Sequence, residues 1–153
     1  MKFYIATRGS DPSMSWAKAL AMRLVALGHE ITYEWWVDIE RERARARPDE
    51  ALTPAERREH ATKDFTGVRD AEVFVYLEPH DKSEGSACEH GGAYMKRLLT
   101  GTPIVVVIGP RRSFIFSELC DYRLDHEDKL IDMLDRLEHE FAWRTKYDRR
   151  NER

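Results

Sequence analysis

The sequence predicts one α/β domain in which helices cover both faces of a parallel sheet. Short runs rich in β-branched and aromatic residues alternate along the chain with stretches whose apolar residues recur at helical spacing. The run at 104–108 is entirely apolar, which is typical of a strand covered on both faces. A chain of 153 residues can also bury a core of its own, about 70% of its unfolded surface. These observations indicate a doubly wound, Rossmann- or flavodoxin-like domain at 1–144, followed by a flexible C-terminal tail at 145–153.

The first half of the chain contains three predicted strands and two predicted helices. The strands, rich in β-branched and aromatic residues, are expected at 2–6, 30–37 and 71–77. One helix is expected at 13–27, with Gly28 as its stop signal, and the other runs from the capping box Thr53-Pro54-Ala55-Glu56 to about residue 68.

A charged segment and two tryptophans lie between these elements. Residues 38–49 include the run Glu-Arg-Glu-Arg-Ala-Arg-Ala-Arg and are expected to form a solvated, mobile segment or a surface helix. Trp35 and Trp36 close the second strand, where alternation sends them to opposite faces. One would then belong to the core, and the other could stack on a ligand base.

The second half continues the alternation of helices and strands. A helix is expected at 86–99, an apolar strand at 103–108, a short strand or turn at 114–119, and a closing amphipathic helix at 125–141. In parallel sheets of this kind ligands bind beyond the carboxyl ends of the strands. The loops that follow the predicted strands, at 7–12, 78–85 and 109–112, are therefore expected to surround a ligand site.

Composition and charge exclude several classes of function. The chain has 25 basic and 28 acidic residues, a net charge of -3, which argues against a general nucleic-acid binder. Its longest apolar run, 104–108, is too short to span a bilayer, and no signal-peptide pattern opens the sequence, so no membrane partner is expected. Cys88, Cys120 and the six histidines lack metal-ligand spacing, so no metal and no cofactor are expected. The default setting is the reduced cytoplasm.

The most suggestive chemical group is Glu89, which follows the loop after the third strand. It is expected about one turn inside its helix, where the helix dipole stabilises an ionised carboxylate by about 0.3–1 kcal/mol. An anionic carboxylate is what nucleophilic attack requires, and the small residues Gly91, Gly92 and Ala93 allow another group to approach closely. An ordinary glutamate at a helix N-terminus would carry the same pattern.

The pattern Gly85-x-x-x-Glu89-x-Gly91-x-Ala93, placed after a strand and a polar loop, resembles the signature of the nucleoside 2-deoxyribosyltransferase family. That family includes related nucleotide N-glycoside hydrolases. Three further segments agree with the resemblance, which extends over roughly residues 2–108: Tyr4-Ile5-Ala6, then Asp64-Phe65-Thr66-Gly67-Val68 followed by Asp70-Ala71-Glu72-Val73, and Gly101-Thr102-Pro103-Ile104.

The resemblance implies a retaining double displacement at the anomeric carbon of a nucleoside or nucleotide. Glu89 would attack this carbon, expel the base and form a glycosyl ester, which a second base resolves in a transferase and water resolves in a hydrolase. Asp64 would protonate the leaving base, with its pKa raised by the nearby Glu89 charge. Tyr4 would contact the sugar or orient Glu89, although it could equally be a core aromatic residue. The resemblance also implies a homo-oligomer, a dimer or higher.

The ends of the substrate would be held by two loops. The family usually carries an aspartate six residues before the nucleophile, where this chain has Ser83, a hydroxyl better suited to a 5′-phosphate. Arg8, Lys82 and Ser86 are possible further phosphate contacts, whereas Glu84 argues against a phosphate there. The expected substrate-binding residues are Thr7, Arg8, Gly9 and Ser10 in the first loop, and Ser83, Gly85 and Ser86 in the second, where Gly85 would let the chain turn into the helix.

The chief alternative is a non-catalytic module that binds or senses a nucleotide. Small Rossmann-like domains can bind a nucleotide without turnover. In both interpretations the partner is a small-molecule nucleoside or nucleotide.

Overall fold

The computed structural model of the chain describes residues 1–46, 51–78, 81, 83–110 and 118–151. These residues form an α/β structure around a five-stranded, all-parallel sheet with the order β2-β1-β3-β4-β5. The strands are β1 (Lys2–Ala6), β2 (Glu30–Ile31), β3 (Val73–Leu77), β4 (Ile104–Ile108) and β5 (Tyr122–Leu124). The predicted fold class, a single-domain Rossmann- or flavodoxin-like sheet, is confirmed.

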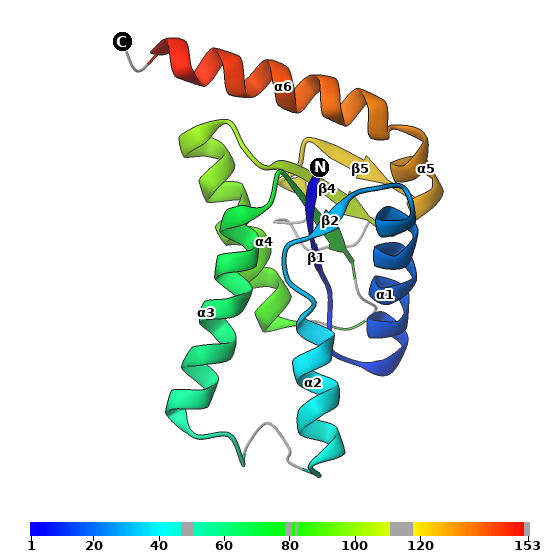
Figure 1. Cartoon of the computed structure of the whole chain (residues 1–153), viewed down its shortest axis with the longest axis vertical. Coiled ribbons are helices and arrows are strands. Elements are labelled where there is room, and N and C mark those ends of the chain that lie inside the picture. Colours follow the sequence, from blue (N-terminus) through cyan, green and yellow to red (C-terminus); the bar gives the residue numbers. More distant parts are fainter. Residues whose placement is uncertain (47–50, 79–80, 82, 111–117, 152–153) are drawn as a thin grey trace.

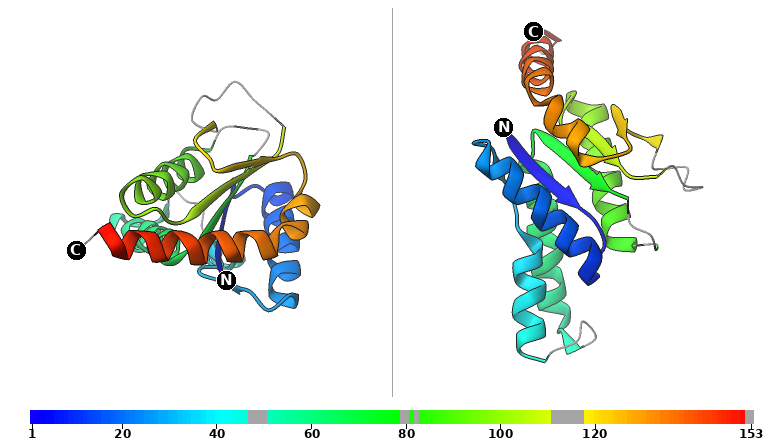
Figure 2. Two further views of the ribbon diagram at one scale, coloured as in Figure 1. Left: turned by 90° about the horizontal axis from the view of Figure 1, so that it is seen from above. Right: turned by 90° about the vertical axis from the view of Figure 1, so that its right-hand side faces the viewer.

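Helices cover both faces of the sheet, as predicted. The described part of the chain contains α1 (Asp11–Ala26), α2 (Trp35–Ala44), α3 (Pro54–Asp70), α4 (Glu84–Thr100), α5 (Glu127–Asp132) and α6 (Leu134–Asn151). α3 and α4 pack side by side on one face, while α1 and α5 lie on the other (Figures 1 and 2). α6 crosses the end of the sheet at which the strands begin, and α2 with the first half of α3 projects beyond the opposite end (Figure 1). None of these described helices combines the length and apolar character needed to cross a bilayer.

The burial of the central strands explains why their sequences are so apolar. All residues of β3 and β4 are buried, so their apolar side chains contact helices on both faces. The strand order reverses between β1 and β3, because β2 lies on one side of β1 while β3 and β4 follow on the other. In flavodoxin-like sheets such a reversal opens a crevice at the carboxyl ends of the two strands, where ligands bind.

The predicted start of α3 and end of α4 are also confirmed. Thr53 and Glu56 form the predicted capping box, in which the Thr53 hydroxyl accepts from the Glu56 amide and the Thr53 amide donates to the Glu56 carboxylate. α4 ends at Gly101, whose φ of 75° lies in the left-handed region that glycine tolerates.

The predicted second strand is wrong over most of its length. β2 pairs with β1 only through Glu30 and Ile31, and the chain then turns into α2. The Trp35 indole donates to the Ile5 carbonyl at 2.7 Å, which satisfies a β1 group that a longer edge strand would have bonded. Trp35 and Trp36 are consequently both buried in one helix instead of facing opposite ways. For the charged segment at 38–49 the sequence predicted either a mobile segment or a surface helix. Its first part is helical, because α2 continues to Ala44.

The C-terminal third also differs from the prediction. The expected short strand or turn at 114–119 lies mostly outside the described residues, and β5 was not predicted. The closing helix is two helices, α5 and α6, separated at Met133, and α6 continues to Asn151, through most of the predicted tail. No glycine or proline interrupts 134–151, and Arg144 anchors α6 to the sheet by donating to the Asp121 carboxylate at 2.8 Å and the Gly101 carbonyl at 3.2 Å.

Candidate active site

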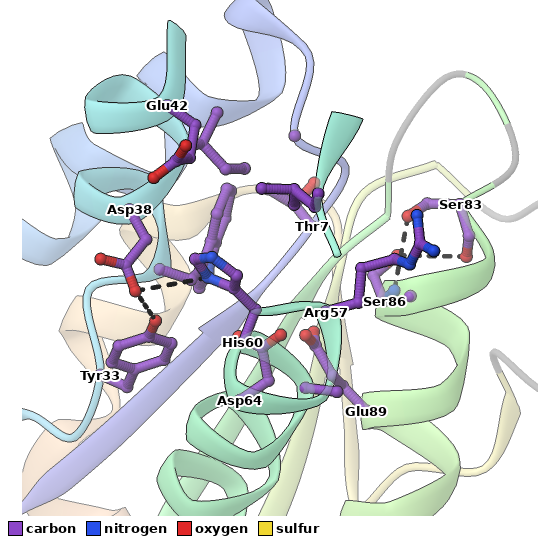
Figure 3. Close-up of a pocket in the computed structure, with 16 residues that line it drawn as sticks. Thr7, Tyr33, Asp38, Glu42, Arg57, His60, Asp64, Ser83, Ser86 and Glu89 are labelled. Carbon is purple, nitrogen blue, oxygen red and sulfur yellow. Dashed lines mark hydrogen bonds and ion pairs between the residues drawn. The ribbon is translucent and has the colours of Figure 1, made fainter. Parts of the chain in front are cut away.

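A cavity of about 430 Å³ opens at the carboxyl ends of β1 and β3, at the crevice expected for this strand order. Its walls come from the loop after β1, from α2 and α3, and from the start of α4 (Figure 3). The lining residues are Thr7, Gly9, Tyr33, Trp35, Asp38, Ile39, Glu42, Leu52, Arg57, His60, Ala61, Asp64, Ser83, Gly85, Ser86 and Glu89.

Three predicted catalytic residues meet at one edge of this cavity. The Tyr4 hydroxyl lies 3.1 Å from Glu89 Oε1 and 3.3 Å from Asp64 Oδ1, so a side chain of β1 joins carboxyl groups from α4 and α3. Tyr4 is fully buried, and its ring stacks on Phe74 with the two ring planes 7° apart. The packed ring holds the hydroxyl in place between the two carboxyl groups.

Gly67 allows α3 to come this close to Tyr4. A Cβ at this position would lie 2.7 Å from two carbons of the Tyr4 ring and 2.8 Å from Tyr33 Cβ. The Tyr4 ring could not yield easily, because it is fully buried in the core. The glycine one turn after Asp64 therefore sets the distance between the Asp64 carboxyl group and the Tyr4 hydroxyl.

The two carboxyl groups are poorly solvated. Burial raises the pKa of Glu89 to about 8, the nearby Asp64 charge adds to the rise, and the Tyr4 hydrogen bond offsets part of it. Burial likewise raises the pKa of Asp64, although the Tyr4 hydrogen bond and His60 act in the opposite direction. The direction predicted for Asp64 is therefore confirmed, but its first cause is burial and not the Glu89 charge.

The Tyr4 contacts constrain the number of protons at the site. A phenol carries one proton and can donate to only one of the two carboxyl groups. Both contacts are hydrogen bonds only when the other carboxyl group is protonated and donates to the Tyr4 oxygen. The raised pKa of Glu89 agrees with a state in which Glu89 and Asp64 share one proton through Tyr4.

The expectation that the helix dipole keeps Glu89 ionised is wrong. α4 begins at Glu84, so Glu89 lies in the second turn, beyond the first turn in which the dipole acts. Its side chain points inward to Tyr4 instead of out to water, and desolvation exceeds the remaining dipole effect.

Most of the predicted substrate-binding residues do line the cavity: Thr7, Gly9, Ser83, Gly85 and Ser86. Thr7 is only 6% exposed, and its hydroxyl has no hydrogen-bond partner in the described structure. Ser83 is the N-cap of α4, where its hydroxyl accepts from the Ser86 amide at 3.4 Å. Gly85 lies inside α4, not at the turn before it, and a Cβ there would contact nothing within 4 Å.

Two predicted residues of the first loop do not line the cavity. Arg8 forms an ion pair with Asp81 at 2.8 Å, and the Ser10 hydroxyl contacts that of Ser13 at 3.2 Å. Lys82, suggested as a phosphate contact, lies outside the described residues.

Sequence reasoning missed the wall formed by α2. Its members Trp35, Asp38, Ile39 and Glu42 fall in segments predicted as a strand and a solvated surface, so their common helical face was not visible. On α3, by contrast, Arg57, His60 and Asp64 follow one face at spacings of three and four residues. Given Asp64, helical spacing could have identified the other two.

Asp38 is the centre of a charged cluster opposite Glu89. Its carboxylate accepts from the Tyr33 hydroxyl and lies 2.7 Å from Arg41, 3.4 Å from Lys63 and 3.5 Å from His60 Nδ1. Burial alone would raise the pKa of Asp38, but the Tyr33 hydrogen bond and the two cations outweigh it and lower the pKa. Asp38 is thus a neutralised anion that joins α2 to α3.

Among the described residues, no group of three or more histidine, cysteine or acidic side chains is placed to hold a metal ion. Comparison with models of protein families, with curated proteins and with solved structures found no match to this chain.

Proposed function

We propose that this protein cleaves the N-glycosidic bond of a nucleoside or nucleoside 5′-monophosphate, with Glu89 as nucleophile. The observation that carries the proposal is the pair of carboxyl groups joined by Tyr4 at the edge of a cavity. A volume of about 430 Å³ lies within the roughly 300–1,000 Å³ typical of small-molecule sites.

The spacing of the carboxyl groups supports a double displacement. One oxygen of each carboxyl group contacts the Tyr4 hydroxyl, at 3.1 and 3.3 Å, and this closeness is compatible with the roughly 5–5.5 Å between the carboxyl groups of retaining glycosidases. Direct attack by Glu89 on the anomeric carbon is consistent with this closeness.

The shared proton gives each group a role. When the proton is on Asp64, this group donates to the Tyr4 oxygen, and the Tyr4 hydroxyl donates to ionised Glu89. Glu89 then attacks the anomeric carbon as the bond to the base breaks, and Asp64 gives its proton to the leaving base. A second base or water displaces Glu89 from the glycosyl ester, and Asp64 accepts the proton of that nucleophile.

The α2 wall offers a surface for the base. Trp35 and Ile39 bring an indole and an aliphatic side chain from α2 to the cavity, and Leu52 adds a second aliphatic side chain from the segment before α3. A flat heterocycle packs well on such a surface. The sugar would then lie between this wall and Glu89.

The direct test is the release of free base from a panel of nucleosides and 5′-monophosphates, in ribo and deoxy forms. We expect release by the wild-type protein and a loss of at least about 1,000-fold in Glu89→Ala, because the nucleophile is removed. Adding a second free base should yield a new nucleoside if the protein is a transferase and only free sugar if it is a hydrolase. No release from any substrate, combined with nucleotide binding that survives Glu89→Ala, would favour the non-catalytic binding module.

A further inference from the structure

His60 is a polar group of the cavity wall that the proposed chemistry leaves without a role. It lies one helical turn before Asp64 on α3, about 6 Å along the helix axis, and both residues line the cavity. In Figure 3 its ring lies between Asp38 on one side and the carboxyl groups of Asp64 and Glu89 on the other. Neither step of the proposed double displacement uses this ring.

One nitrogen of the His60 ring is held by Asp38. His60 Nδ1 lies 3.5 Å from Asp38 Oδ2, and the Asp38 side chain is only 9% exposed. This carboxylate is itself fixed, because it also accepts from the Tyr33 hydroxyl and pairs with Arg41 at 2.7 Å and Lys63 at 3.4 Å. The ring is therefore anchored to the α2 wall through Nδ1.

The Asp38 carboxylate determines which nitrogen of the ring carries a hydrogen. An ionised carboxylate only accepts hydrogen bonds and would repel a lone pair on Nδ1, so the hydrogen is on Nδ1. Arg41 and Lys63 already neutralise Asp38, so a second proton on His60 would add a third positive charge at one carboxylate. In the neutral ring that results, Nε2 has a lone pair and is a hydrogen-bond acceptor.

Nε2 is available to a ligand in the part of the cavity proposed for the base. No described residue forms a hydrogen bond or an ion pair with this nitrogen. Its ring is anchored to the same wall as Trp35 and Ile39, on which the base is proposed to pack. The sugar is proposed to lie between this wall and Glu89, so His60 would meet the edge of the base that is remote from the glycosidic bond.

We infer that His60 determines base specificity: its Nε2 accepts a hydrogen bond from an exocyclic amino group, so the protein prefers adenine and cytosine to hypoxanthine and uracil. This inference rests on the proposed N-glycosidase function. The amino group of adenine or cytosine is a donor, whereas the oxo group at the same position of hypoxanthine or uracil is an acceptor. An oxo group facing Nε2 would leave two acceptors unpaired, which disfavours the oxo bases.

The test compares kcat/KM at pH 8 for base release from adenosine with that from inosine, and from cytidine with that from uridine, in the ribo, deoxy or 5′-phosphorylated form that the protein accepts. We expect the wild type to prefer the amino base of each pair about 10-fold or more. His60→Phe keeps a planar ring without an acceptor and should lose this preference. His139→Phe, the same change at an exposed histidine of α6 that does not line the cavity, should keep it. A wild-type preference for the oxo bases would overturn the inference.

Binding of free bases separates this inference from the function on which it rests. Titration of adenine and of hypoxanthine into the wild type and into His60→Phe measures the same preference without turnover. Tighter binding of adenine that depends on His60, without base release from any nucleoside, would support the role of His60 and refute the N-glycosidase. Base release with the same preference in wild type and His60→Phe would do the reverse. Neither base release nor a binding preference that depends on His60 would overturn both.

Discussion

The raised pKa of Glu89 predicts a cost in stability that can be measured without any substrate. The folded-state pKa of about 8 lies above the ordinary value of 4.5, so the native state holds a proton that the unfolded chain releases between these values. At about 1.36 kcal/mol per unit, the shift corresponds to an upper limit of about 5 kcal/mol. Glu89 is partly open to the cavity, and solvent screening reduces this to roughly 2–4 kcal/mol.

The sign of the effect follows from the direction of the shift. The Glu89 contribution to the free energy of unfolding is full below about pH 4.5 and is lost as the pH rises to about 8. Glu89→Gln keeps an oxygen that accepts from the Tyr4 hydroxyl but cannot ionise. The free energy of unfolding of this variant minus that of wild type should therefore increase by roughly 2–4 kcal/mol as the pH is raised from 5 to 9.

Urea unfolding of both proteins at pH 5, 7 and 9 measures this difference. Glu84→Gln removes an exposed carboxylate from the same helix and controls for the change in net charge. A difference between Glu89→Gln and wild type that stays constant across the three pH values would refute the argument that Glu89 is desolvated. A difference that falls with increasing pH would mean that the site prefers the ionised carboxylate.

Two further substitutions test the geometry around the pair of carboxyl groups. Thr7→Val removes a buried hydroxyl without a partner, so we expect the free energy of unfolding to rise by about 1 kcal/mol. Gly67→Ala places a Cβ 2.7 Å from the Tyr4 ring, so we expect a loss of about 1–3 kcal/mol in urea unfolding and at least about a 10-fold loss in base release.

Each of these two variants has a matched control. Thr7→Ser keeps the hydroxyl and should not show this gain in stability, and a less stable Thr7→Val would mean that the hydroxyl has a partner in the folded protein. For Gly67, the matched change is Gly91→Ala, because a Cβ at Gly91 would contact nothing within 4 Å. Equal effects at the two glycines would contradict the close approach of α3 to Tyr4.

Local signals in the sequence were sufficient for much of the fold. The apolar run of β4, the capping box at Thr53 and the left-handed stop at Gly101 depend on residues close to one another in the chain. Each depends on steric or hydrogen-bonding preferences that neighbouring residues already possess. The same holds for the alternation of strands and helices that indicated a parallel sheet.

The α2 region had no such determining local signal. Its aromatic residues have a high preference for strands, but their burial against the end of β1 and the Trp35 bond to Ile5 favour a helix. Packing over long sequence distances outweighs a propensity of at most about 1 kcal/mol per residue. The α2 wall of the cavity, including Asp38, therefore became visible only in the folded chain.

The candidate site divides in the same way. The sequence by itself determined which residue types are present, and the resemblance singled out Tyr4, Asp64 and Glu89. Only the tertiary structure decided that one hydroxyl joins the two carboxyl groups, that Arg8 turns away to Asp81, and that Arg57 faces the cavity instead. It also reversed the expected direction of the Glu89 pKa shift, because desolvation depends on atoms contributed by distant parts of the chain, whereas a helix dipole depends on position within one helix.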